Sequence, residues 1–234
     1  AVKRGYDLNV SNGNSSVVIR PLYPRQLAYS NFVHDYPEDL YWEIKEGPTE
    51  DLSASEEYYS FHLPATTNQV KGVTAIIVKD SVNQKELPMI ERREGKDWIG
   101  LRVTYKGKVT DIYVNQLADG RLMHMNSWID ADGWSTDAYM LAVSYKDGGN
   151  PAKPDEYFVG HGSALRRDGD VYYSSLSKLN MITSQYDNAM DVYVTGQPRV
   201  NMSVKGSPLQ LNVNGRKHNI NRKGDTINIR LRNE

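Results

Sequence analysis

The sequence predicts an all-β protein, an antiparallel β-sandwich with little helix. Short runs that alternate polar and apolar residues, or that are rich in β-branched residues, recur through all 234 residues. Gly, Pro, Asn and Asp separate these runs, as expected for strands joined by turns. The aromatic residues are mainly amphipathic, with 16 Tyr and 4 Trp against 3 Phe. Such rings pack one face and leave a polar tip in water, which suits two packed β layers or subdomains.

The first half of the chain contains six clear strand-like runs. We expect strands at residues 16–20, 40–44, 58–63, 73–78, 98–105 and 109–114. Lys106 and Gly107 lie between the last two runs and predict a hairpin turn. A second turn at 118–120 leads into a run at 121–125. Three consecutive antiparallel strands are therefore expected over 98–125.

The second half of the chain continues the pattern. We expect strands at residues 138–145, 157–159, 171–173, 190–194, 200–204, 209–213 and 226–231. Turns are expected at 167–169 and at Asn214-Gly215, and brief helices around 24–29 and 174–180. Roughly fifteen short strands at this spacing are typical of a sandwich and leave no space for a helical domain.

The Gly- and Pro-rich stretch at 147–154 is the candidate boundary within the chain. It separates a larger sandwich portion, 1–150, from a C-terminal β portion, 151–234. Such a stretch forms either a loop within one sandwich or a seam between two β layers. We expect the two portions to be continuous.

Composition excludes several classes of function. A net charge of -1 gives no polycationic surface for nucleic acid, and no apolar run approaches the ~18 residues of a membrane span. The chain has no Cys, and its five His are scattered without metal-ligand spacing, so no metal site is predicted. Nucleophile-elbow, phosphate-loop and His-Glu-x-x-His motifs are absent.

A basic strip lies near the C-terminus. It is either a solvated face or a weak contact for an anionic ligand. Its members are Arg216, Lys217, Arg222, Lys223, Arg230 and Arg232.

The stretch from Arg121 to Tyr139 is the candidate functional segment, because one His, two Trp, three Asp and a Tyr crowd into it. His124 is either a packed histidine bonded to the backbone or a general acid or base, or a neutraliser of a sugar carboxylate. Asn126 and Tyr139 are the neighbours that would support the second role.

Trp128 and Trp134 could each stack on a sugar ring or fill the space between two sheets. Arg121 is a candidate contact for an acidic sugar. The sequence Asp130-Ala-Asp132-Gly133 resembles the opening of a calcium loop but lacks the bidentate Glu, and Asp and Gly also form turns. No cofactor is therefore predicted, and calcium has only this weak support.

Three stretches, at 121–128, 133–143 and 157–169, carry a resemblance to a known family. They read RLMHMNSW, GWSTDAYMLAV and YFVGHGSALRRDG. Together they resemble the C-terminal β-sandwich region of heparinase II/III-like polysaccharide lyases, over about residues 50–185.

The resemblance implies a secreted or periplasmic β module that follows a helical toroid and helps it grip an acidic polysaccharide. In such lyases a Tyr or His abstracts a proton beside the uronate carboxylate, and an Asn or His neutralises that carboxylate. His124 is the position that would match the β-domain His, with Tyr139 as its catalytic partner. Arg121, Asn126, Trp128 and Trp134 would contact substrate.

The chain contains no segment that could form the toroid. We therefore expect a β-sandwich module that contacts an acidic glycan or packs against a catalytic toroid. Two alternatives stay open, a polysaccharide lyase acting by β-elimination and a noncatalytic structural or adhesion protein.

Overall fold

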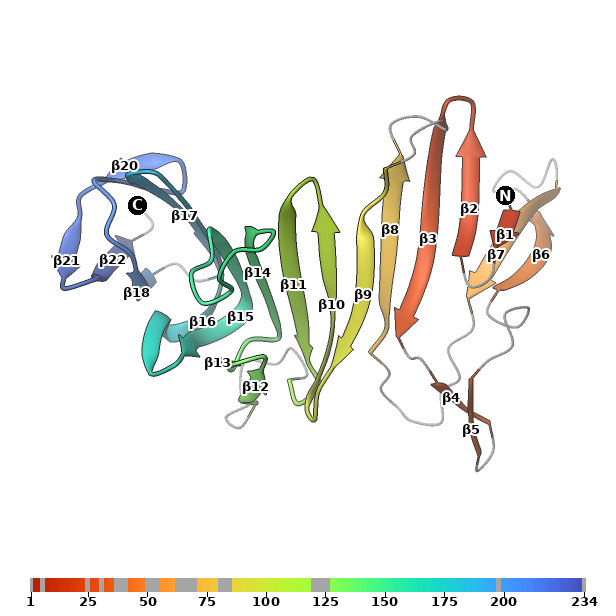
Figure 1. Cartoon of the computed structure of the whole chain (residues 1–234), viewed down its shortest axis with the longest axis horizontal. Coiled ribbons are helices and arrows are strands. Elements are labelled where there is room, and N and C mark those ends of the chain that lie inside the picture. Colours follow the sequence, from red (N-terminus) through yellow and green to blue (C-terminus); the bar gives the residue numbers. More distant parts are fainter. Residues whose placement is uncertain are drawn as a thin grey trace. The chain divides into compact units, whose positions relative to one another are not determined.

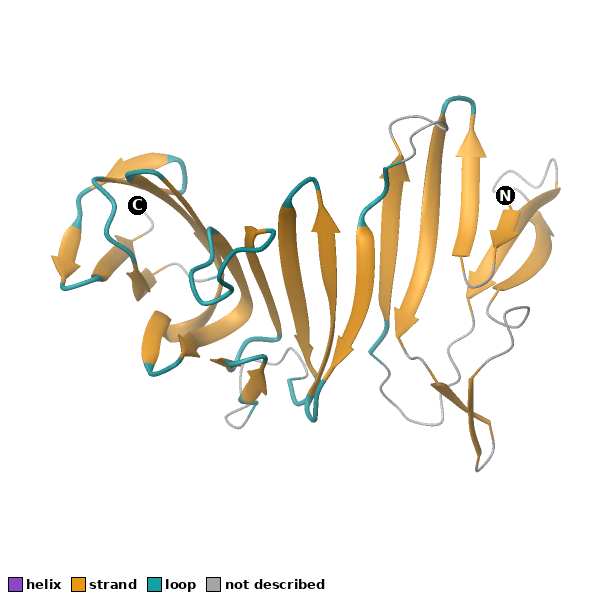
Figure 2. Ribbon diagram, in the orientation of Figure 1, coloured by secondary structure: helices purple, strands orange, loops and turns teal. Residues whose placement is uncertain are grey.

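The computed structural model shows strands, turns and loops, and its described residues contain no helix (Figure 2). The described residues are 2–4, 7–23, 26–29, 32–35, 42–48, 55–61, 71–79, 86–118, 127–196 and 199–232. The predicted all-β class is confirmed. The brief helices are wrong: residues 174–180 lie within strand β16 (Asp170–Tyr186), and residues 26–29 form strand β4 (Gln26–Tyr29).

The chain divides into two compact units, Ala1–Leu87 and Pro88–Glu234. The expected boundary near residue 150 is not where the chain divides. Residues 147–155 connect β14 (Met140–Lys146) to β15 (Glu156–Arg167), and these two strands pair antiparallel. The Gly- and Pro-rich stretch is therefore a hairpin loop within one sheet.

Unit 1 contains a four-stranded antiparallel sheet in the order β1-β2-β3-β8, together with two separate hairpins. The sheet strands are β1 (Val2–Arg4), β2 (Asp7–Asn12), β3 (Ser15–Tyr23) and β8 (Val73–Lys79). The hairpins are β4 with β5 (Phe32–Asp35), and β6 (Trp42–Pro48) with β7 (Ser55–Phe61). Arg20 of β3 donates two hydrogen bonds to Asp7 of β2, at 2.8 and 2.7 Å.

Unit 2 is built from two layers that share the long strands β15 and β16 (Figure 1). Layer A has the order β20-β19-β17-β16-β15-β14-β11-β10-β9. Its other strands are β9 (Met89–Glu94), β10 (Trp98–Tyr105), β11 (Lys108–Asn115), β17 (Ala189–Thr195), β19 (Gln210–Val213) and β20 (Arg216–His218).

Layer B continues from the far halves of β15 and β16. Residues 165–167 of β15 pair with β13, and residues 173–175 of β16 pair with β18. The order is β12-β13-β15-β16-β18-β22-β21, with β12 (Ile129–Ala131), β13 (Trp134–Thr136), β18 (Arg199–Lys205), β21 (Asn221–Lys223) and β22 (Thr226–Arg232). Two bent strands thus form the corner of the sandwich, as in packings whose strands pass from one sheet to the other.

The predicted hairpin at 98–114 is confirmed, since β10 and β11 pair in full register around Lys106 and Gly107. Both turn residues have positive φ, 48° and 72°, which matches a two-residue hairpin turn. The third strand expected at 121–125 lies outside the described residues. The other described neighbour of β11 is β14.

A bulge on β15 makes the corner. The pairing with β16 shifts between Val159 and Gly162 and again before Ala164, and His161 has a φ of 51°. A Cβ on Gly162 would lie 2.7 Å from the Cβ of Ala138, so only glycine fits without displacing a neighbour. The bulge lets one strand serve both layers.

One hydrophobic core lies between the layers, because alternate residues of each strand point inward. Layer A contributes Tyr113, Leu141, Val159, Met181 and Val192, all buried. Layer B contributes Ile129, Trp134, Leu165, Val204 and Ile227 to the same core. Burying each large apolar side chain contributes roughly 1.5–3 kcal/mol, so these rows are the main stabilisation of unit 2.

Charged groups meet at the β9–β11 end of layer A. Arg102 donates from Nε and Nη2 to the two carboxylate oxygens of Asp111, at 2.7 and 2.9 Å. The Tyr145 hydroxyl donates to Asp111 Oδ2 at 2.8 Å. The Asp111 side chain is 4% exposed, so these partners replace its water.

The same end ties layer B to layer A. Asp132, in the β12–β13 turn, accepts a hydrogen bond from the Tyr113 hydroxyl at 3.0 Å. Its carboxylate also forms an ion pair with Arg93 at 3.0 Å. Tyr113 and Arg93 belong to layer A. The position of the hairpin is therefore set by polar contacts as well as by core packing.

Candidate functional site

The β12–β13 hairpin presents the described part of the candidate segment. It turns at Asp132 and Gly133, whose φ values are 50° and 85°. This geometry is the mirror-image turn favoured by Asp-Gly in hairpins. The Asp130–Gly133 sequence thus forms a turn, and the Asp132 carboxylate is bound to Tyr113 and Arg93.

Asn115 fixes the chain on both sides of this hairpin. Its buried side-chain amide donates to the carbonyl oxygens of Ser127 and Ala138, the second at 3.0 Å. Its Oδ1 accepts from the backbone of Leu117 at 2.9 Å. Ser127 is buried and its carbonyl is hydrogen-bonded to Asn115. The backbone is therefore fixed directly before Trp128.

Trp128 lies on the outward face of layer B and is 40% exposed. The guanidinium carbon of Arg166, on β15, lies 5.2 Å from the centre of its indole ring. An Arg over an indole face is attracted by the ring quadrupole, which orients both groups. The aromatic surface and the cation therefore stand together in water.

The outward face carries a row of polar groups beside Trp128. Asp130, Ser135 and Arg166 lie opposite one another on β12, β13 and β15. Trp128 directly precedes β12, and the contact of its ring with Arg166 places it on this same face. We call Trp128, Asp130, Ser135 and Arg166 the Trp128 face.

Trp134 lies on the opposite face and fills the core. It is 1% exposed, its ring meets that of Tyr172 edge to face at 4.9 Å, and Arg167 lies 4.9 Å from its centre. The expected sugar contact at Trp134 needs correction, because no open ring surface remains. Trp134 instead fills the space between the two sheets, which was the other alternative for this residue.

Asp137 anchors the end of the hairpin to the corner bulge. Its carboxylate accepts from Ser163 N and Ser163 Oγ, both at 2.7 Å, and from Ala164 N at 3.0 Å. Lys178 Nζ lies 3.9 Å from Asp137 Oδ2. All of these acceptor positions are used, so Asp137 is a structural group.

Tyr139 is half-buried and directly precedes β14. Its backbone N–H donates to Gly160 at 2.9 Å, and its carbonyl accepts from Asn115 at 3.0 Å. Arg121, His124 and Asn126 lie outside the described residues. The structure therefore places Trp128 on an open face, Trp134 in the core and Tyr139 at the layer A edge of the corner.

His161 stands out at the corner, next to Gly160. Its left-handed backbone is strained for a residue with a Cβ, and its N–H donates to Asn180 Oδ1 at 2.8 Å. Its ring Nε2 is buried and has no hydrogen-bond partner among the described residues. Strained residues with an unsatisfied group occur more often at functional positions.

The buried tyrosines are proton donors at neutral pH. Burial raises the pKa of Tyr145 to about 12, and its hydrogen bond to Asp111 adds to that shift. Burial, and next the negative charge of Asp111, also raise the pKa of Tyr113. Neither phenol is a base at neutral pH, and both stabilise the carboxylates beside them.

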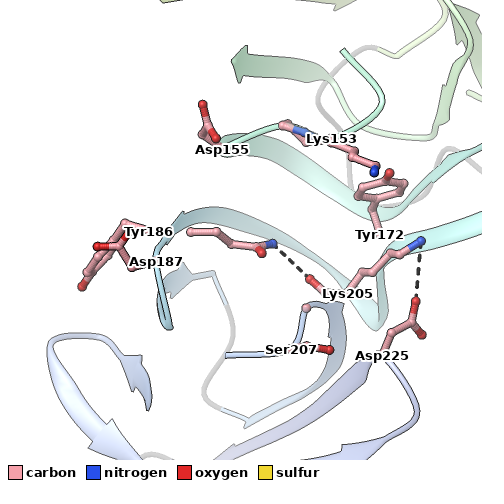
Figure 3. Close-up of a pocket in the computed structure, with 11 residues that line it drawn as sticks. Lys153, Asp155, Tyr172, Tyr186, Asp187, Lys205, Ser207 and Asp225 are labelled. Carbon is pink, nitrogen blue, oxygen red and sulfur yellow. Dashed lines mark hydrogen bonds and ion pairs between the residues drawn. The ribbon is translucent and has the colours of Figure 1, made fainter. Parts of the chain in front are cut away.

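Two open hollows accompany the Trp128 face in unit 2. The first, of about 450 Å³, is lined by Lys153, Asp155 and Tyr172 on one side and by Lys205 and Asp225 on the other (Figure 3). Lys205 contacts the Tyr172 ring at 5.0 Å and is paired with Asp170 and with Asp225, the latter at 3.6 Å. Its charge is thus neutralised within the protein.

The second hollow, of about 460 Å³, lies where β16, β18 and β22 meet. Arg199 and Arg230 line it, together with Leu176, Ser177 and Asn201. We call it the Arg199–Arg230 hollow. It includes one member of the predicted basic strip, Arg230.

Sequence patterns did not identify Arg166 as a site residue. Arg166 lies within one of the stretches that carry the family resemblance, but its place beside Trp128 follows from the pairing of β13 with β15. That pairing joins residues far apart in the sequence and has no local signal. Arg199 was missed for the same reason.

Within the described ranges, no group of three His, Asp or Glu side chains could hold a metal ion. The same residues include no helix long and apolar enough to cross a membrane. No protein-family model matches the chain, and no curated protein matches it in sequence.

Proposed function

We propose that this chain is a β-sandwich module that binds an acidic polysaccharide through the Trp128 face, within a secreted or periplasmic glycan-degrading protein. The observation that carries the proposal is an exposed indole on a fixed hairpin, with a guanidinium over it. A sugar ring offers an apolar C–H face for the indole, and a uronate offers a carboxylate for the cation. In the parent protein, a helical toroid would supply the catalytic groups.

The exposed position of Trp128 supports this proposal on energetic grounds. An indole left in water contributes little to folding, whereas burial against a ligand gains the hydrophobic free energy of that contact. The carbonyl of Ser127, the residue before Trp128, is held by Asn115, so little conformational entropy is lost when a ligand binds. Arg166 makes no ion pair with any carboxylate in the described part of the chain and is available to an anionic ligand.

Binding to immobilised or titrated acidic polysaccharides tests the proposal. The panel is polygalacturonate, alginate, chondroitin sulfate and heparan sulfate, with dextran as the neutral control. We expect Trp128→Ala to weaken binding about 10-fold, the equivalent of 1.4 kcal/mol, and Trp128→Phe to retain most of it.

Tyr193→Ala is the matched control, because Tyr193 is an exposed aromatic residue on β17 in layer A, at 49%. It should bind like the wild type. Equal binding by Trp128→Ala and the wild type would exclude the stacking role.

A polysaccharide lyase is the second candidate, and the corner between the layers favours it. There Tyr139 and the strained His161 stand on neighbouring strands, since Tyr139 donates its N–H to the residue before His161. β-Elimination needs a base and a proton donor in one site. Ultraviolet absorbance of unsaturated uronate, formed from any polymer of the panel and lost in His161→Ala, is the expected signal. Absence of that signal across the panel would remove this candidate.

A further inference from the structure

The Arg199–Arg230 hollow is a second charged surface on layer B. Adjacent antiparallel strands place its polar groups, because Asn201 of β18 lies opposite Arg230 of β22. Arg199 precedes Asn201 by one alternation, so both share the outward face with Arg230. Val200 and Met202, on the other face of β18, are buried in the core.

The hollow also has an apolar wall. Leu176 lies on β16 just after the residues that pair with β18, and it is 84% exposed. Ser177 follows it and adds a hydroxyl. The hollow thus combines cations, an amide, a hydroxyl and an exposed leucine in a volume within the range of ligand sites, about 300–1,000 Å³.

The two guanidinium groups of the hollow are not neutralised as Arg102 and Lys205 are. Arg102 is bound to Asp111, and Lys205 to Asp170 and Asp225. Among the described residues, no carboxylate forms an ion pair with Arg199 or Arg230. Two like charges on neighbouring strands repel each other, and an anion between them would relieve that repulsion.

We infer that the Arg199–Arg230 hollow binds an acidic group of a polysaccharide, as a second subsite on layer B. A planar guanidinium binds a carboxylate with two parallel hydrogen bonds, and Asn201 can bond to sugar hydroxyls. Leu176 contacts the C–H face of the ring. The inference rests on the proposed function in taking the anion to be part of a polysaccharide.

The two subsites lie on one face of one sheet. The path from β12 to β22 crosses β13, β15, β16 and β18, at about 4.8 Å between strands, so the subsites are on the order of 20–25 Å apart. A short oligosaccharide reaches one subsite, whereas a polymer reaches both. Simultaneous contact raises the apparent affinity for the polymer without any new contact.

The experiment uses the double variant Arg199→Gln/Arg230→Gln and the polymer of the panel that the wild type binds most tightly. We expect the polymer to bind about 10-fold more weakly, from two lost charge-assisted contacts. The salt dependence of binding should also become shallower, because fewer counterions are released. The matched control, Arg216→Gln/Lys217→Gln on β20 of layer A, removes the same charge and should bind like the wild type. Thermal unfolding of all variants confirms that each is folded.

The outcomes separate the two proposals. If the Arg199/Arg230 variant weakens binding and Trp128→Ala does not, the hollow is a subsite and the stacking role fails. If only Trp128→Ala weakens binding, the inference about the hollow is overturned. Equal weakening by the β20 control would also overturn it, because the effect would then be one of net charge. Lack of binding to every polymer by the wild type overturns both.

Discussion

The two faces of layer B differ in what their side chains do, and two tryptophans show the difference. Trp134 and Trp128 flank the same Asp132–Gly133 turn. Trp134 points inward and is enclosed by Tyr172 and Arg167, whereas Trp128 points outward beside Arg166. The same residue type therefore stabilises the fold on one face and is available to a ligand on the other.

The comparison extends to the charged groups. At the β9–β11 end of layer A the charged side chains are paired, as Arg102 is with Asp111. On the outer face, Arg166 and the two arginines of the Arg199–Arg230 hollow are open to an anion. Inner residues should therefore control the free energy of unfolding, and outer residues should control binding.

The largest expected effect is that of Trp134→Ala on stability. Removing a buried indole loses its burial and leaves a cavity, which costs about 3–5 kcal/mol. Urea denaturation measures this loss. Trp128→Ala should stay within about 0.5 kcal/mol of the wild type, as expected for a surface position. Similar losses for both variants would contradict the assignment of the two faces.

Asp111→Asn should have the next largest effect. It leaves Arg102 and Tyr145 with a neutral partner at a buried position, at a cost of roughly 2 kcal/mol in the free energy of unfolding. Chemical denaturation again gives the value, while binding to acidic polysaccharides should not change. A variant as stable as the wild type would show that this cluster does not stabilise the sandwich.

Tyr145→Phe tests the same cluster through the pH dependence of the free energy of unfolding. The pKa of Tyr145 is raised to about 12 in the folded protein, above the value of about 10 for a free tyrosine. Its contribution is thus complete below pH ~10 and is lost as the pH rises toward 12. We expect the variant to lose about 1 kcal/mol at neutral pH and to depend less steeply on pH between ~10 and ~12. An identical pH profile would show that this phenol does not stabilise the fold.

Asp130→Asn should have the smallest effect, and it should strengthen binding where Trp128→Ala weakens it. Asp130 lies in one row with Ser135 and Arg166. Its negative charge would repel the acidic ligand that we propose for this face. Its neutralisation should tighten binding of the acidic polymer about twofold, as expected for an exposed charge, and leave dextran unaffected. Titration calorimetry at low salt measures the change. Weaker binding would mean that Asp130 itself bonds to the ligand.

The strands and turns of unit 2 were largely predictable from the sequence, because alternation and Asp-Gly or Asn-Gly pairs are local signals. Residues 98–105 and 109–114 and the turn between them match β10 and β11 closely. The helix expected at 174–180 failed because tertiary pairing, first with β18 and then with β17, keeps β16 extended. Of the two alternatives for the stretch at 147–154, the loop within one sheet describes its place, because β14 pairs with β15 across it.

The site was less predictable. The alternatives for Trp128 and Trp134 could not be resolved from the sequence, since inward and outward positions depend on which strands pair. Arg166 became a site residue only through the pairing of β13 with β15. Roles for Arg121, His124 and Asn126 stay predictions.

The most direct test of the two-face account follows the indole N–H signals of Trp128 and Trp134 by NMR. The signals are assigned with the Trp128→Phe and Trp134→Phe variants, and an acidic oligosaccharide from the best-bound polymer is then titrated. The account predicts that the Trp128 signal shifts in a saturable way while the Trp134 signal stays in place. A saturable shift of Trp134 with no change at Trp128 would contradict it.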